Sequence, residues 1–171
     1  MRLELRVNGG SVANEIEPQE LLLDFLRDRL GLTGAKRSCD MQACGVCTVL
    51  VDGRPVSSCC YLAADAEGRD VLTIEGLTER PEFERLGEAF TRHAALQCGF
   101  CTPGMLLTVS ALLETGELTG IQEVKRSLAG KSHAVNGHYW SVADGVTPVR
   151  VEVGEVRCRQ YADDARHLLG V

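Results

Sequence analysis

The sequence predicts an α+β protein, with a small mixed β-sheet and one helix in its first half and a helical second half. Apolar and polar residues alternate over residues 2–7, as they do in a strand with one buried face. From residue 82 onward the apolar residues recur at helical spacing instead. We therefore expect two domains, covering residues 1–77 and 78–171.

The predicted sheet begins with a hairpin. Asn8-Gly9-Gly10 is a turn signal, and residues 11–16 return as the second strand. Apolar residues between positions 19 and 30 suit a helix packed on a sheet, which Gly31 and Gly34 end. The remaining strands are expected at residues 48–51, at 55–60 after the tight turn Asp52-Gly53, and at 71–74.

The second half contains four predicted helices. Residues 82–94 have helical spacing, and Thr102-Pro103 is typical of a helix start, with Pro at the first helical position. That helix would run to Leu113, and residues 121–128 and 160–169 offer two more.

Composition narrows the possible functions. The formal charge of −6 argues against a nucleic acid partner, and no stretch reads as a signal peptide or a membrane span, so we expect a cytoplasmic protein. Eight cysteines without an export signal favour metal or redox chemistry over disulfides. No nucleophilic triad, paired carboxylates or phosphate-binding loop stands out, so we expect no catalytic residue in this chain.

The strongest motif is a cysteine spacing in the first half. Cys39-x4-Cys44-x2-Cys47, followed by Cys59, is the ligand spacing of plant-type [2Fe–2S] ferredoxins. Each iron needs two thiolates, and here one loop would supply three of the four while the next strand supplies the last. Zinc sites favour paired C-x2-C knuckles, of which this segment has one. On a strand Cys59 and the adjacent Cys60 would point to opposite faces, so we expect Cys60 to be a core thiol.

Three segments resemble the iron–sulfur subunit or domain of the molybdenum hydroxylases, the family of xanthine dehydrogenase, aldehyde oxidoreductase and aerobic carbon monoxide dehydrogenase. They are residues 38–53, 71–77 and 97–105. The resemblance implies a β-grasp ferredoxin domain followed by a helical-bundle domain that holds a second [2Fe–2S] cluster. It also implies that Gln97 contacts the pterin of a molybdenum cofactor.

The resemblance further implies a role and partners. In this family electrons leave the substrate at a molybdopterin centre on a large subunit, pass through the helical-domain cluster and then the ferredoxin-type cluster, and reach FAD. The chain would thus be an electron-transfer subunit, in complex with a large molybdopterin subunit and an FAD subunit. Substrate chemistry would belong to another chain.

The second cysteine motif departs from the family pattern. Cys98 and Cys101 match its first pair, but His133 and Val135 stand where the family has Cys-x-Cys, and Cys158 is the one remaining distal cysteine. Three alternatives follow: a cluster bound by Cys98, Cys101, Cys158 and His133; an empty site with packed thiols; or zinc bound by the pair with His133 or His138.

The missing thiolates also support a rival function. In that alternative the chain is a binding or assembly module that keeps one cluster for stability and has lost the second cluster and the relay.

Lys36 and Arg37, which flank the first motif, are expected to be solvated basic residues.

Overall fold

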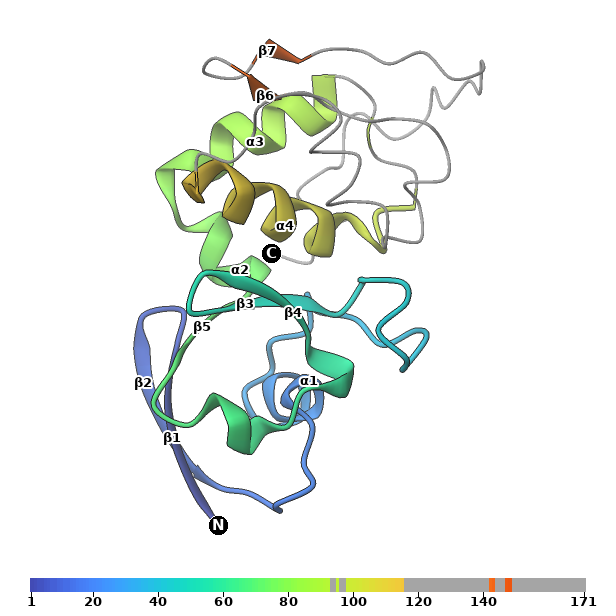
Figure 1. Ribbon diagram of the computed structural model, residues 1–171. Helices are drawn as coiled ribbons and strands as arrows, with labels where there is room; N and C mark the ends of the chain where they lie inside the picture. The colour runs from blue at the N-terminus through green and yellow to red at the C-terminus, as the bar shows by residue number, and fades with distance from the viewer. Residues whose placement is uncertain (93–94, 96–97, 116–141, 144–146, 149–171) are drawn as a thin grey trace.

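A five-stranded mixed sheet forms the centre of the computed structural model, which describes residues 1–92, 95, 98–115, 142–143 and 147–148 (Figure 1). One helical segment lies on one face of the sheet and the helices of the second half lie on the other (Figure 1). The strands, in the spatial order β2-β1-β5-β3-β4, are β1 (Arg2–Val7), β2 (Gly10–Glu15), β3 (Thr48–Val51), β4 (Arg54–Ser57) and β5 (Asp70–Leu72).

Two tight hairpins shape this sheet. β1 pairs antiparallel with β2 and parallel with β5, while β3 pairs antiparallel with both β4 and β5. The hairpin turns hold Asn8-Gly9 at φ 52° and 82° and Asp52-Gly53 at φ 49° and 75°. These left-handed conformations are the ones that Asn-Gly and Asp-Gly turns adopt between twisted strands, so both predicted turns are confirmed.

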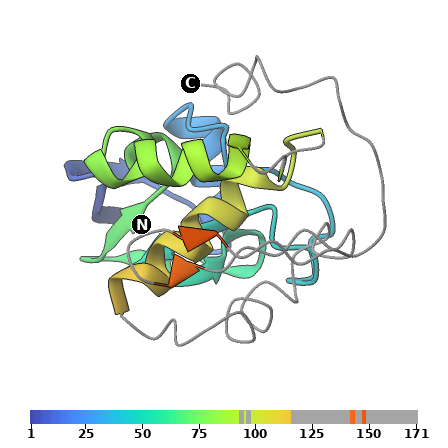
Figure 2. The same ribbon diagram turned by 90° about the horizontal axis from the view of Figure 1, so that it is seen from above.

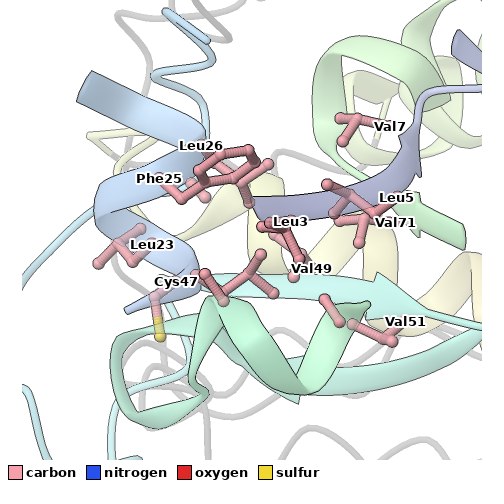
Figure 3. Close-up of a cluster of buried hydrophobic side chains, with 14 of the residues drawn as sticks. Leu3, Leu5, Val7, Leu23, Phe25, Leu26, Cys47, Val49, Val51 and Val71 are labelled. Atoms are coloured by element: carbon pink, nitrogen blue, oxygen red, sulfur yellow. The ribbon is translucent and has the colours of Figure 1, made fainter. Parts of the chain in front are cut away.

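Strand β3 is buried on both faces. Val49 and Val51 point toward β1 and the first helical segment, where they contact the core around Leu3 (Figure 3). Leu50, between them, faces the other way and packs with Leu106 of the second half. Because side chains alternate along a strand, one four-residue strand serves two hydrophobic clusters.

The first helical segment is shorter than predicted. It consists of α1 (Leu22–Asp24) continued by a π-helical turn over Phe25–Arg29. The expected start at residue 19 is wrong because Leu21 forms a β-bridge with Leu62 and the Leu22 N–H donates to the Tyr61 carbonyl at 2.7 Å. These contacts keep the backbone extended until residue 22.

Two predicted strands end early. β4 stops at Ser57, and Ser58–Cys60 form a 3-10 turn, as do Ala63–Ala66. β5 stops at Leu72 because the Thr73 N–H donates to the Asn8 side chain at 2.9 Å, and Ile74 opens the unpredicted helix α2 (Ile74–Thr78).

Helices α3 (Pro81–Arg92) and α4 (Thr102–Thr115) confirm two of the predicted helices and cross above the sheet (Figure 2). Leu50, Leu77, Leu86 and Leu106 share one hydrophobic cluster, so the two halves pack directly together. The short pair β6 (Val142–Ala143) and β7 (Thr147–Pro148) is antiparallel. The helices predicted over 121–128 and 160–169 lie outside the described residues.

The mixed α+β class is therefore confirmed, while the full helical bundle of the second half stays a prediction. Among the described helices, none combines the length and the apolar character needed to cross a membrane.

Candidate metal centre

The four cysteines of the first motif come from one loop and the hairpin that follows it. Cys39, Cys44 and Cys47 lie in the irregular segment between the π-helical turn and β3. Cys59 lies in the 3-10 turn after β4, and the β3–β4 pairing brings that turn back to the loop. Ser58 fastens it there, because its N–H and its hydroxyl donate to the Cys47 carbonyl at 3.3 and 2.6 Å.

The loop directs backbone N–H groups at the Cys39 sulfur. Asp40, Gln42 and Gly45 have φ of 50°, 60° and 67°, and such left-handed residues turn successive N–H groups inward to form an anion-binding concavity. Hydrogen bonds from the N–H groups of Met41, Cys44 and Ala43 lower the pKa of the Cys39 thiol to about 7, and the Cys44 nitrogen lies 3.4 Å from that sulfur. The backbone thus stabilises negative charge on Cys39.

Cys47 and Cys59, unlike Cys39, lie in an apolar, buried environment. They are 1% and 4% exposed and belong to the hydrophobic cluster under the sheet (Figure 3 labels Cys47). Burial, together with the nearby Cys59 thiol, raises the pKa of Cys47 to about 11, although the Cys59 N–H donates to its sulfur. A thiolate is costly there unless a cation replaces its proton, which is what iron would do.

This donor set fits a [2Fe–2S] cluster, in which each iron takes two thiolates. The four cysteines come from one loop and the turn fastened to it: the Cys44 N–H donates to the Cys39 sulfur at 3.4 Å, and both Cys59 and Cys44 act on the Cys47 thiol. Within the described part of the chain, no three metal-binding side chains lie close enough together to hold a single ion.

Cys60 is not the core thiol that strand alternation predicted. It is exposed, its sulfur lies 3.7 Å from the Cys59 sulfur, and it donates to the Asp40 carbonyl at 3.6 Å. The prediction fails because residues 58–60 form a 3-10 turn, in which neighbouring side chains do not alternate between two faces. The turn buries Cys59 and leaves Cys60 at the surface.

The second cysteine pair lies at the start of α4. Cys98 is exposed, whereas Cys101 is 8% exposed and its thiol donates to the Met105 sulfur at 3.6 Å. Burial raises the pKa of Cys101, and the neighbouring Cys98 and Cys44 act in the same direction. Cys101 and Cys44 belong to one hydrophobic cluster, so the second cysteine pair lies against the loop of the first motif. The other predicted site residues, Gln97, His133 and Cys158, lie outside the described residues, as does His138.

A glycine contact joins the two cysteine regions. A Cβ placed on Gly104, in the first turn of α4, would lie only 2.3 Å from the Gly45 carbonyl oxygen and 3.4 Å from the Thr48 side chain. The same Gly45 carbonyl accepts a hydrogen bond from the Thr48 hydroxyl at 2.7 Å. Only a residue without a side chain lets α4 pack this closely against the loop that carries Cys39, Cys44 and Cys47. Sequence reasoning missed this contact, although a glycine in a helical turn is itself a signal of close approach.

The two basic residues that flank the loop differ in exposure and in their partners. Arg37 is exposed and pairs with Asp24 and, at 2.6 Å, with Asp40. Lys36 is half-buried, so its expected solvated position is wrong. Its ammonium donates to the Gly34 carbonyl at 3.0 Å and lies 5.8 Å from the centre of the Phe100 ring.

Comparison with known protein families agrees with this geometry. The family described as "2Fe-2S iron-sulfur cluster binding domain" matches residues 5–73, and the family described as "[2Fe-2S] binding domain" matches residues 73–144. The two matches cover the first motif and the second cysteine pair, respectively.

Similar proteins are subunits of dehydrogenases. The chain is 36% identical over 162 residues to the 6-hydroxypseudooxynicotine dehydrogenase complex subunit beta of Paenarthrobacter nicotinovorans, covering 95% of this chain and 98% of that protein. It is 38% identical over 139 residues to the xanthine dehydrogenase iron-sulfur-binding subunit of Escherichia coli O157:H7, covering 80% and 86%. A chain of quinoline 2-oxidoreductase from Pseudomonas putida 86 superimposes with a TM-score of 0.72 at 34% identity, over 98% of this chain and 96% of that one.

Proposed function

The chain belongs to the iron–sulfur subunits of molybdenum-hydroxylase-type dehydrogenases, whose role is electron transfer, and we propose that it relays single electrons from a molybdopterin centre toward a flavin. It carries a [2Fe–2S] cluster, which supplies one-electron redox chemistry when bound. The chain's own residues would hold the redox groups, and the hydrophobic cluster around Cys47 and Cys59 would exclude water from one side of the first cluster.

Cys39, Cys44, Cys47 and Cys59 are the proposed ligands of the first cluster. Their placement on one loop and on the turn fastened to it supports this assignment, and so does the contrast between the surroundings of Cys39 and those of Cys47 and Cys59. Cys39 receives backbone N–H groups at the solvent side of the loop, whereas Cys47 and Cys59 are buried among apolar side chains. Hydrogen bonds to sulfur and solvent exposure are two factors that set the potential of such clusters, about −400 mV for the plant type.

Cys98 and Cys101 are the proposed first two ligands of a second [2Fe–2S] cluster. The single observation that carries the relay is the position of Cys101, which packs in one hydrophobic cluster with Cys44, beside the contact of Gly104 with Gly45. A redox group there would lie next to the first cluster. Cys158 and His133 are the proposed sources of the remaining ligands, and Gln97 would contact the pterin.

The proposed architecture and partners follow the family. A β-grasp ferredoxin domain over residues 1–77 and a helical-bundle domain over 78–171 would present the two clusters to a large molybdopterin subunit and an FAD subunit. The relatives' names as a complex subunit beta and an iron-sulfur-binding subunit support membership of such an assembly, which we place in the cytoplasm.

Iron and acid-labile sulfide content, with EPR spectra of the reduced chain, tests this function. About four irons per chain and two distinct signals are expected for the relay, because each cluster contains two irons. About two irons with one signal would contradict the relay and favour the rival, a cluster-stabilised binding or assembly module.

A further inference from the structure

Lys36 lies between the two cysteine regions and contacts both. Its backbone N–H donates to the Val46 carbonyl at 3.2 Å, and its ammonium donates to the Gly34 carbonyl at 3.0 Å, so both ends of the residue are fastened to the first loop. The same ammonium faces the ring of Phe100, which stands immediately before Cys101, at 5.8 Å from the ring centre. These contacts restrict the Lys36 side chain, whereas an exposed lysine side chain usually samples many rotamers.

The charge of Lys36 acts in a poorly solvated place. Half-burial lowers the pKa of its ammonium, while the Glu75 carboxylate and, less strongly, the nearby Cys101 oppose that change and Arg27 adds to it. The Glu75 carboxylate accepts hydrogen bonds from the Gly34 N–H at 2.8 Å and the Thr73 hydroxyl at 2.6 Å, and its negative charge offsets part of the field of Lys36. What remains of that field is less screened by water than the field of a surface charge, because the Lys36 side chain is half-buried.

Arg37 provides the contrast. It carries the same charge one residue along the chain, but it is exposed and paired with two carboxylates, Asp24 and Asp40. Its net field at the second pair is correspondingly small, because paired and solvated charges are strongly screened.

From this geometry we propose that Lys36 sets the difference in reduction potential between the two cysteine sites, by raising the potential of the redox group held by Cys98 and Cys101. Reduction adds one electron to that group, and a fixed positive charge beside it stabilises the added negative charge. Lys36 is a positioning residue for electron transfer, since it acts on the group through space without binding it. The proposal rests on the second cluster of the proposed function.

An EPR-monitored redox titration of the full-length chain tests this role. The signal of the second site is the one that survives Cys47→Ala, which removes a ligand of the first. In Lys36→Met we expect that signal to titrate at lower potential. At a fixed solution potential its ratio of oxidised to reduced form should change at least tenfold, which for a one-electron couple is a shift of about 59 mV in the midpoint potential. The first-site signal should move less.

Two further variants separate charge from shape. Lys36→Arg keeps the charge and should keep the potential, and Arg37→Gln removes the neighbouring charge and should leave the second-site signal in place. An unchanged potential in Lys36→Met, or an equal shift in Lys36→Arg, overturns the proposal. If Lys36→Met loses its iron, Lys36→Gln carries the same test, and loss of the second-site signal in both neutral variants overturns the proposal, because Lys36 would then be needed to hold the group and not to set its potential.

Failure of the underlying function gives a different result. About two irons and one signal in the unmodified chain would remove the second redox group, and with it both the relay and the role of Lys36. Four irons in the unmodified chain, together with a second-site potential that does not change in Lys36→Met, would overturn the role of Lys36 alone.

Discussion

The two cysteine regions are built on different principles. The first is closed within a short stretch of chain, because the hairpin of β3 and β4 returns Cys59 to the loop that carries Cys39, Cys44 and Cys47. The second begins with Cys98 and Cys101 at a helix start and depends on α4 resting against the first loop. A locally closed donor set is specified by spacing and turns, whereas one that spans distant segments is specified by packing.

The largest effect is expected from breaking the first region alone. Cys47→Ala removes a buried donor of the first site, so the chain should lose about two irons and the corresponding EPR signal while keeping the second. Iron analysis and EPR measure this. Cys60→Ser is the matched control, since Cys60 is exposed and is not one of the four proposed ligands, and it should keep all the iron. Loss of iron in Cys60→Ser equal to that in Cys47→Ala would show that the fourth ligand is misassigned.

The contact between the regions can be broken at Gly104. In Gly104→Ala the new methyl group would meet the Gly45 carbonyl at 2.3 Å, and neither backbone can yield without shifting the helix or the loop. We expect a loss of up to about 3 kcal/mol in the free energy of unfolding, typical of overpacking, and altered EPR signals from both sites. Denaturant unfolding and EPR measure the two effects.

Gly87→Ala in α3 is the control for this substitution. A Cβ at Gly87 would lie 3.7 Å from the Phe83 ring, an ordinary contact, so the helix should gain about 1 kcal/mol from the better helix former. Similar behaviour of the two alanine variants would contradict the close approach of α4 to the loop.

A smaller effect is expected at Glu75, which ties the first loop to α2. Glu75→Ala removes the acceptor of the Gly34 N–H and the nearer of the two acceptors of the Thr73 hydroxyl, which keeps Asn8 at 3.4 Å, and the loss should cost about 1–2 kcal/mol of unfolding free energy. Because Gly34 also holds the Lys36 ammonium, the second-site potential should move as well. Glu79→Ala, at an exposed position of the same segment, should change neither quantity.

The smallest effect is expected far from both regions, at the exposed pair Arg6–Asp70. The hydrogen bond from Arg6 lowers the pKa of the Asp70 carboxyl, so its contribution is present above the unfolded-state pKa of an aspartate and is lost as pH falls through the folded-state value. Asp70→Asn should therefore be slightly less stable than the unmodified chain at neutral pH, and the gap should close on acidification. Thermal unfolding at several pH values checks this, and a gap that widens in acid would contradict it.

Local patterns determined much of this protein from sequence. The alternation over β1, the Asn8-Gly9 and Asp52-Gly53 turns, and the starts of α3 and α4 were predictable because each depends on neighbouring residues. The cysteine spacing of the first region predicted a cluster for the same reason, since the loop and its hairpin are close in the chain.

Tertiary structure decided the environments. Segments far apart in the sequence determine the exposure of Cys60 and the contact of Lys36 with Phe100. They also determine why Gly104 must lack a side chain. Periodicity reports which face of an element is apolar, but only packing decides what covers that face. The cysteine spacing predicted the ligands of the first cluster, while the packing of α4 against the loop of the first motif decided the surroundings of Cys101 and Lys36.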